Sequence, residues 1–485
     1  MSLSTTLNAA LSGLGAAARG AEVVASNIAN ARTPGYARRE LQLTGIVLDG
    51  KGQGVRGSGT ARIVDLALAN DRRAAGALSA GASVRSGFLA GLERVIGLPG
   101  DPGSLGDRIG RLEGAILAAA GRPEAEARLA GIAAEARALA GGLSQASAHV
   151  QQERERADRA IAADVDFLNR TLAQIADLNG RIRQVAGSGR DAAGLVDLRA
   201  QLIDGIAEIV PLRELPREHG QVALYTAGGA ALLDGGPAVF GFEAAGTIVP
   251  QMTQASGALS GLTLNGRPLA TGGVGTLIAG GRLAAAFAVR DELAPAAQAR
   301  LDALARDLLE RFADPATDPS LGPGAPGLFA DLGGPSGPGA EIGLAGRLRL
   351  NPLADPDAGG ELWRIRAGLG AAGPGDSGSA AQLDRLAAAL DAPRVPASGG
   401  FGPGARSFSS LAADLASGLV AARLSEEDAA THLFARLATL REIEAAGGVD
   451  TDVELQRLLQ IERAYAANAR VIQAVDRMLE NLMGL

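Results

Sequence analysis

The sequence predicts an elongated, multidomain protein that is mainly α-helical and carries a β-rich insertion. Apolar residues recur at helical spacing at both ends of the chain and through a long central stretch, residues 123–210. Between residues 211 and 281, short β-favouring pieces alternate with glycine-rich turns. Hydrophobic residues make up 47% of the 485 residues but aromatic residues only 3%, so alanine, which favours helix and permits close helix packing, contributes much of the core.

Three domains are expected from these changes along the chain. The two ends are predicted to pair as coiled-coil helices, and the segments between them are predicted to form a bundle of long helices with short strands and loops. A small outer β domain is expected to be inserted into this bundle. The ranges are 1–36 with 448–485 for the terminal pair, 37–210 with 282–447 for the bundle, and 211–281 for the insertion.

The N-terminal helix is predicted from a stripe of small and aliphatic residues separated by alternating steps of four and three. At 1.5 Å per residue this helix is about 40 Å long. It is expected to end at Asn30 and the turn Thr33-Pro34-Gly35, because proline disfavours helix in the residue before it and Pro-Gly fits the middle of a type II turn. The stripe consists of Leu3, Leu7, Ala10, Leu14, Ala17, Ala21, Val24 and Ile28.

The C-terminal helix carries a second stripe of the same kind. It consists of Leu458, Ile461, Tyr465, Asn468, Ile472, Val475, Leu479 and Leu482. Asn468 is expected to fix the register of the pair, because a single buried Asn in such a stripe can do so at some cost in stability. Each stripe needs a partner, and the simplest partner is the other terminus. The pattern alone also fits two amphipathic helices that cover a globular core.

Further helices and short strands are predicted in the middle of the chain. A helical stretch at 59–96 ends at a break over 99–106, and the stretch at 123–210 is interrupted near 187–189. Within that stretch, the charged run at 151–159 is expected to be a solvated helix face. The other elements are an apolar stripe from Val165 to Ile182, strands at Val222–Thr226, Ala238–Phe242 and Leu262–Leu264 with a turn at Asn265-Gly266, helices at 282–312, 380–391 and 406–446, and loops with short strands at 313–360.

The composition argues against several classes of function. The net charge of −7 argues against nucleic acid as the main partner, because phosphate binding needs concentrated Lys and Arg. The absence of cysteine removes disulfides, thiolate metal sites and a cysteine nucleophile. No stretch of 18 apolar residues appears, so no membrane insertion is expected. The first basic residue, Arg19, follows the apolar positions, which is unlike a secretory signal peptide.

No catalytic site, metal site or cofactor is predicted. The three histidines, at positions 149, 219 and 432, lie far apart in unrelated contexts. Residues 52–57 satisfy the GxGxxG pattern after a strand-like segment, Leu41 to Leu48. A dinucleotide site also needs an acidic residue after a second strand, whereas Asp71 lies within a helical run. We therefore interpret the glycine-rich run as a hairpin loop.

Motifs at both ends of the chain resemble the signatures of the flagellar rod, hook and hook-associated proteins. They are AALSGL (9–14) and SNIANARTPGY (26–36) at the N-terminus, and GVD (448–450), LQ (459–460), RAYAANARVI (463–472) and DRML (476–479) at the C-terminus. Within that family, the middle of the chain is similar to hook-associated protein 1. The segments concerned are IADLNGRI (175–182), GLVDLRAQLI (194–203), RL (282–283) and AVRD (288–291).

The resemblance implies a structural, non-enzymatic protein of the bacterial flagellum, extracellular at the hook–filament junction and exported without a cleaved signal peptide. The terminal helices are expected to line an inner tube, with the long helices outside it and the β insertion facing outward. The implied partners are further copies of the chain in a ring or helical assembly, the flagellar hook protein, the next hook-associated junction protein, and an export chaperone on the C-terminal helix.

Assembly is expected to depend on the terminal stripes. The residues concerned are Leu3, Leu7, Leu14, Val24 and Ile28 on the first helix and the eight stripe residues of the last. A second set, Asn27, Asn30, Thr33, Pro34, Gly35 and Tyr36, is expected to set the turn that leaves the inner helix. The alternatives are another axial component such as a hook or distal rod protein, an axial protein that bears an enzyme, and a cytosolic coiled-coil scaffold.

Overall fold

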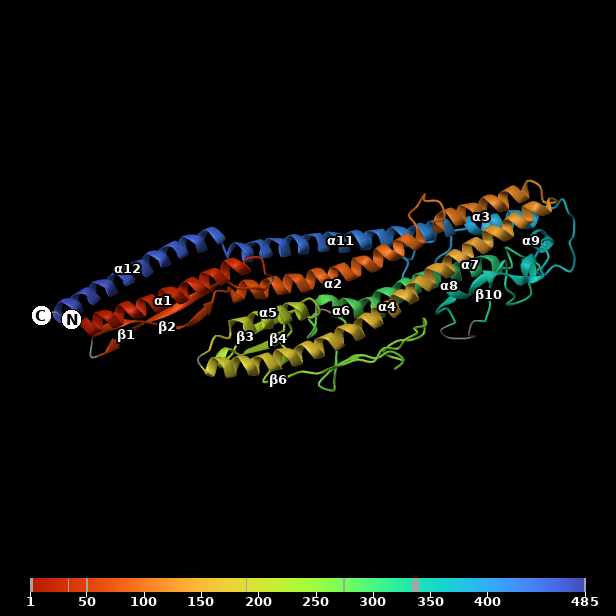
Figure 1. Cartoon of the computed structure of the whole chain (residues 1–485). Coiled ribbons are helices and arrows are strands. Elements are labelled where there is room, and N and C mark those ends of the chain that lie inside the picture. Colours follow the sequence, from red (N-terminus) through yellow and green to blue (C-terminus); the bar gives the residue numbers. More distant parts are fainter. Residues whose placement is uncertain are drawn as a thin grey trace.

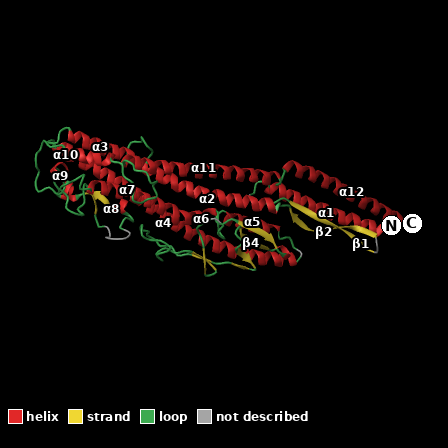
Figure 2. Cartoon of the chain, turned by 180° about the vertical axis from the view of Figure 1, so that it is seen from behind, coloured by secondary structure: helices red, strands yellow, loops and turns green. Residues whose placement is uncertain are grey.

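The computed structural model describes residues 3–33, 35–48, 51–188, 190–273, 275–333 and 340–483. The molecule is elongated, and its first and last helices lie side by side at one tip (Figure 1). The strands and most loops lie beside or between the long helices (Figure 2). The predicted fold class, mainly helical with paired terminal helices and small β-sheets, is confirmed.

Helices form most of the described chain. They are α1 (Leu3–Asn30), α2 (Leu66–Ile96), α3 (Leu105–Ala120), α4 (Glu126–Gly187), α5 (Ala193–Ala207), α6 (Gly281–Ala288), α7 (Ala294–Ala313), α8 (Leu344–Arg347), α9 (Trp363–Ala367), α10 (Ala381–Asp391), α11 (Phe408–Ala446) and α12 (Thr451–Met483). A π-helical turn, Val289–Leu293, joins α6 to α7.

The strands form small antiparallel sheets. They are β1 (Arg39–Leu48), β2 (Lys51–Arg62), β3 (Leu212–Pro216), β4 (Val222–Thr226), β5 (Ala231–Asp234), β6 (Gly236–Pro237), β7 (Phe240–Gly241), β8 (Leu262–Leu264), β9 (Arg267–Leu269), β10 (Phe329–Asp331) and β11 (Leu348–Leu350). The sheet orders are β1-β2, β3-β4-β5-β6, β7-β8-β9 and β10-β11. The predicted strands at 222–226 and 262–264 are confirmed, whereas the one at 238–242 shortens to β7.

The glycine-rich run at 52–57 lies within β2, so its interpretation as a hairpin loop is wrong. In the register of the hairpin, Leu48 of β1 pairs with Lys51 of β2. Because β2 continues to Arg62, the helix that was expected from residue 59 begins only at Leu66. Within this strand, Gly54 packs closely on α1.

The central helix α4 buries its predicted apolar stripe from Val165 to Ile182. The charged run at 151–159 has the predicted solvated face at Gln152, Arg156 and Arg159. The prediction is wrong for Arg154 and Asp158, which are each only 1% exposed. The sequence pattern could not show this, because the residues that cover these charges come from distant segments. Buried charges are tolerated when they are paired and hydrogen-bonded.

The π-helical turn places Arg290 against this part of α4. Arg290 is fully buried, and its Nη1 donates to Asp158 Oδ1 at 2.7 Å. Its Nη2 donates to the carbonyl oxygen of Ser260 at 2.8 Å. The second oxygen of Asp158 accepts from the amide of Ala245 at 2.8 Å. These contacts attach the loop that precedes β8 to both α4 and the π-helical turn.

The β-rich insertion shares its core with the helices. Leu224 of β4, Phe240 of β7 and Leu262 of β8 are buried and belong to the same hydrophobic cluster as the stripe of α4. Asn265, between β8 and β9, has φ +52°, and Gly266 has φ +76°, as the predicted turn requires.

Candidate assembly interface

Helices α1 and α12 pack antiparallel, and their facing positions repeat every seven residues. The pairs are Gly13 with Asn468, Gly20 with Ile461, and Asn27 with Glu454. Each step of seven residues forward on α1 matches a step of seven back on α12. The two helices therefore keep one register over at least two heptads, as coiled-coil packing requires.

Glycine allows the two helices to approach closely. A Cβ on Gly13 would lie 2.6 Å from Asn468 Nδ2, and a Cβ on Gly20 would lie 3.2 Å from Ile461 Cδ1. The Asn468 amide donates to the Ala464 carbonyl oxygen of its own helix, at 3.0 Å. Asn468 therefore contacts α1 by packing against Gly13, while its amide hydrogen bond stays within α12.

The β1-β2 hairpin packs on a second face of α1. Gly54 has φ +111°, and a Cβ there would overlap Ser12 Oγ and lie 3.1 Å from Ala9 Cα. Ser12 Oγ accepts from the amide of Val55 at 3.1 Å and donates to the carbonyl oxygen of Ala9 at 2.8 Å. Gly54 thus lets the strand lie directly on the helix, a known use of glycine in strands.

Asn27 is the polar centre of the interface and is fully buried. Its Nδ2 donates to Glu454 Oε2 and to the Arg39 carbonyl oxygen, both at 2.9 Å. Its Oδ1 accepts from Tyr36 Oη at 2.8 Å and from the Arg39 amide at 2.9 Å. All four hydrogen-bonding positions of the side-chain amide are therefore occupied, and one residue joins α1, β1 and α12.

Glu454, which is 1% exposed, balances its buried charge with two arginines. Arg38 Nε donates to Oε1 at 2.9 Å, and Arg457 Nη1 lies 3.3 Å from the same oxygen. With the Asn27 amide on Oε2, both carboxylate oxygens have partners. A buried carboxylate without such partners is strongly unfavourable, so this cluster specifies which residues of the two helices meet.

A second carboxylate connects the terminal helices to the bundle. Asp197, on α5, accepts from Arg39 Nη2 at 2.7 Å and from Arg62 Nε at 2.8 Å. The two arginines come from the first position of β1 and the last position of β2, which pair with each other. Since Asn27 also binds the Arg39 backbone, the hydrogen bonds are continuous from α12 to α5.

The residues of the turn motif lie around the end of α1. Thr33 Oγ1 donates to Asn30 Oδ1 at 3.2 Å, and Asn30 Nδ2 donates to the Ser26 carbonyl oxygen at 2.9 Å. Gly35 has φ +76°, and a Cβ there would lie 2.5 Å from Gln201 Cγ on α5. Pro34 lies outside the described residues. Tyr36 and Asn27 contribute to the cluster described above rather than to the turn alone.

The predicted stripes lie partly in the helix contact and partly beside it. On α1, Val24 is buried, while Leu3, Leu7, Leu14 and Ile28 are half-buried. On α12, Val475 is buried, Leu458, Ile461, Asn468 and Ile472 are half-buried, Tyr465 is 49% exposed and Leu479 is 37% exposed. The side chain of Leu482 lies outside the described residues. Their role in assembly stays a prediction.

Sequence reasoning missed the line of α1 that faces α12 most closely. That line is Gly13, Gly20 and Asn27, and none of these scores as apolar. The available signal was the exact spacing of seven between two glycines and a buried amide. The partners Arg38 and Asp197 carried no comparable signal, because only the fold brings them near.

We expect Gly13→Val to separate the two helices, because the added side chain overlaps Asn468. The expected cost is about 1–3 kcal/mol, typical of overpacking. Faster proteolysis of α1 and α12 at an unchanged rate for the bundle would show it. Gly15→Val is the matched control, since a Cβ on Gly15 meets nothing within 4 Å. Equal protease resistance of the two variants would contradict the close contact.

The described residues offer little for other chemistry. Within them, no group of His, Asp and Glu is placed to hold a metal ion. No helix in the same part of the chain is long and apolar enough to cross a membrane.

Three family models match separate parts of the chain. The model for the flagellar hook-associated protein FlgK helical domain matches residues 89–316. The model for the flagellar basal body rod FlgEFG protein C-terminal matches residues 446–485, and the one for the flagella basal body rod protein matches residues 7–36. The two terminal matches thus fall on α12 and α1, the helices that pack together.

Curated relatives show the same likeness. Flagellar hook-associated protein 1 of Escherichia coli (strain K12) is 26% identical over 243 residues, which cover 49% of this chain and 44% of the relative. The protein of that name from Salmonella typhimurium is 27% identical over 287 residues, covering 54% and 51%. The chain spans about half the length of the curated relatives it matches. A solved structure of the flagellar hook junction protein FlgK from Burkholderia pseudomallei has a TM-score of 0.45 and 20% identity, covering 55% of this chain and 47% of that chain.

Proposed function

We propose that this chain is a structural junction protein of the flagellum, because it is similar to flagellar hook-associated protein 1 in its middle and to flagellar rod proteins at its two ends. It polymerises through its terminal helices and connects the hook to the filament. It is a structural component and not an enzyme. The proposal rests most on one observation: the two terminal rod-protein matches fall on helices that pack against each other and leave apolar side chains exposed, among them Tyr465 and Leu479.

The proposal includes the place and the partners of the protein. The terminal pair, 1–36 with 448–485, is the assembly domain, and the bundle with its insertion lies outside it. Neighbouring copies, the hook protein and the next hook-associated junction protein contact the chain outside the cell. An export chaperone covers α12 beforehand, because exposed apolar surface promotes unwanted association.

A deletion of this gene in its own bacterium tests the function. Electron microscopy of the cell surface should show hooks without filaments, and the filament subunit should accumulate in the medium. Normal filaments would contradict the proposal. Absent hooks would place the protein in the rod or the hook instead.

We expect Leu479→Asp or Ile472→Asp to abolish filament attachment while the bundle stays folded, because each puts a charge into the apolar stripe of α12. Filament counts per cell, with circular dichroism of the purified protein, measure the two effects. Leu117→Asp is a matched control, because Leu117 is 55% exposed on α3, far from the terminal helices (Figure 1). Normal filament attachment in both α12 variants would refute the assembly role.

A further inference from the structure

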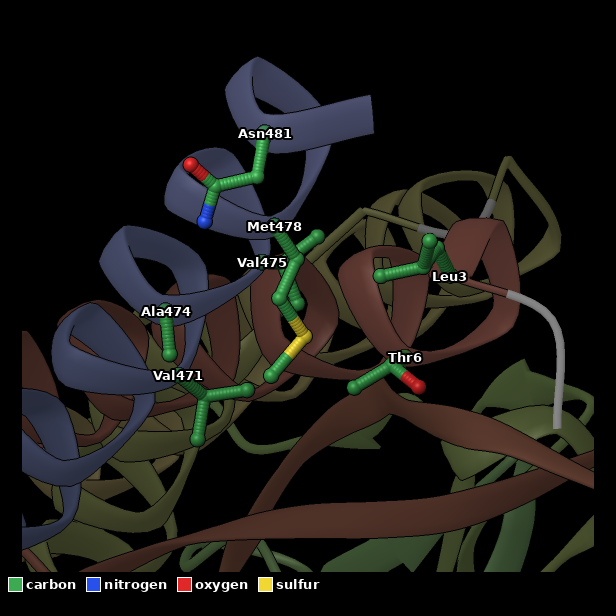
Figure 3. A pocket seen from close by; sticks show the side chains of 7 residues that line it. All are labelled: Leu3, Thr6, Val471, Ala474, Val475, Met478 and Asn481. Atoms are coloured by element: carbon green, nitrogen blue, oxygen red, sulfur yellow. The ribbon is translucent and has the colours of Figure 1, made fainter. Parts of the chain in front are cut away.

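The hollow at the tip of the molecule, between Leu3 of α1 and Val471 and Met478 of α12, belongs to the terminal helix pair already described (Figure 3). A site of a different kind lies in the β-rich insertion, which is placed beyond that pair along the length of the molecule (Figure 1). What happens there is independent of the proposed function.

The sequence contains two Asn-Gly pairs, Asn179-Gly180 on α4 and Asn265-Gly266 in the insertion. Such a pair is chemically reactive, because glycine has no side chain to keep its amide nitrogen away from the side-chain carbonyl carbon of the asparagine. The fold decides whether the two atoms can meet, and it treats the two pairs differently.

Asn265 and Gly266 are exposed and form the tip between β8 and β9. The two strands have three residues each, and β9 is an edge strand of its sheet. Leu264 pairs with Arg267, so the turn consists of the Asn-Gly pair alone. Asn265 has φ +52°, a left-handed conformation that is uncommon for a residue with a side chain. So short a hairpin opens at little cost in free energy.

The two sides of this turn are held differently. Asn265 is fixed to Val239, which precedes β7: its backbone amide donates to the Val239 carbonyl oxygen at 2.8 Å, and its Oδ1 accepts from the Val239 amide at 2.9 Å. Gly266 leads into the edge strand, where Arg267 and Pro268 are exposed. Movement of β9 can therefore bring the Gly266 nitrogen toward a side chain that stays in place.

We propose that Asn265 is a site of spontaneous deamidation. The amide nitrogen of Gly266 attacks Cγ of Asn265. As the new N–Cγ bond forms, the Cγ–Nδ2 bond breaks, and Nδ2 leaves as ammonia with the proton of the Gly266 amide. The Val239 amide stabilises the charge that builds on Oδ1 during the attack, as an oxyanion hole does. Water then opens the resulting succinimide ring at either carbonyl carbon, which gives aspartate or isoaspartate.

Isoaspartate at this position changes the hairpin. The main chain then passes through the former side chain and gains one methylene group, so Leu264 and Arg267 lose their register. The side-chain amide that accepted from Val239 is gone, and a carboxylate is added at the tip. We expect the β7-β8-β9 sheet to loosen while the helices stay folded.

Asn179-Gly180 is a control within the same chain. Asn179 is 7% exposed; its Nδ2 donates to the Val222 carbonyl oxygen at 2.9 Å, and its Oδ1 accepts from Arg199 Nη1 at 2.8 Å. Gly180 lies within α4, where each backbone amide donates to the carbonyl oxygen four residues earlier. Reaction at Asn179 therefore needs a core helix to open, which costs far more than opening a hairpin tip.

Mass spectrometry of the purified full-length chain tests the inference. The protein is incubated in neutral buffer, folded or in concentrated urea, and the mass increase of the peptide that contains each Asn-Gly pair is followed after digestion. Labelling with an isoaspartate methyltransferase identifies the isoaspartate. In the folded protein we expect Asn265 to react about ten times faster than Asn179 or more. In urea, where the fold protects neither pair, we expect similar rates.

Asn265→Gly is the matched control, because glycine adopts the left-handed conformation of the turn and has no side-chain amide to lose. Faster protease cutting between β7 and β8 as the wild type ages, and a constant rate in Asn265→Gly, would support the loosening of the sheet. Reaction at Asn265 no faster than at Asn179 in the folded protein would overturn the inference. The same mass increase in Asn265→Gly would also overturn it, because the change would then lie at another residue.

Discussion

Asn27→Leu is expected to release α1 from α12 and from the hairpin while the bundle stays folded. Leucine has nearly the shape of asparagine but makes none of its four hydrogen bonds. Glu454 then keeps a buried carboxylate oxygen without the Asn27 amide, and the Arg39 backbone loses two partners. An unsatisfied buried polar group costs about 1–3 kcal/mol. We expect the combined cost of these lost hydrogen bonds to exceed the packing energy between α1 and α12.

Limited proteolysis with mass spectrometry measures this effect. Cuts should appear first within α1 and α12 of the Asn27→Leu protein, at least ten times faster than in the wild type. Asn8→Leu is the matched control, because Asn8 is exposed on the same helix. Unchanged cutting rates for Asn27→Leu would show that the cluster does not hold the terminal helices.

The double variant Asn27→Leu/Glu454→Leu measures the interaction energy between the two side chains. When both residues are leucine, neither leaves the other with an unsatisfied buried polar group. The double variant should therefore lose less stability than the sum of the two single variants. We expect a coupling on the order of 1–3 kcal/mol, as for residues in direct contact. Strict additivity would mean that the hydrogen bond between the two helices contributes nothing of its own.

Arg290→Met is expected to destabilise the bundle by about 3–5 kcal/mol, because it leaves the charge of Asp158 buried without its partner. The loop that contains Ser260 also loses a donor from the π-helical turn. Burial also lowers the pKa of the neighbouring Arg154, in the direction expected where charge is disfavoured. A lower urea midpoint, with earlier protease cuts in the insertion than elsewhere, is the expected result.

Two further variants test the cause. Arg183→Met, at an exposed position of α4, controls for the loss of a surface arginine. Arg290→Met/Asp158→Leu removes both charges and should recover part of the lost stability, because a buried ion pair contributes little beyond its apolar replacement. A double variant as unstable as Arg290→Met alone would assign the effect to the other contacts of the guanidinium, namely its hydrogen bonds to Asp291 and its packing on Phe242 and Phe287.

Helical spacing in the sequence was a reliable guide where one side of a helix is apolar. The stripe from Val165 to Ile182 is buried as predicted, and α1 ends at Asn30 as the turn motif indicates. The charged run at 151–159 was only half predicted, because one side of it is solvated while Asp158 on the other side is buried against Arg290 and the insertion. A charge says nothing by itself about whether a distant residue of opposite sign will cover it.

The sequence by itself determined the helices, the apolar sides of the two terminal ones, and the motifs that match the family. Only the tertiary structure decided which line of α1 meets α12, that Asn27 and Glu454 are joined across 427 positions, and that the glycines at 52–57 form a strand against a helix. Periodicity is a property of one segment and survives in the sequence. Close approach at a glycine and satisfaction of a buried polar group are properties of two segments, and they exist only once the fold has brought both together.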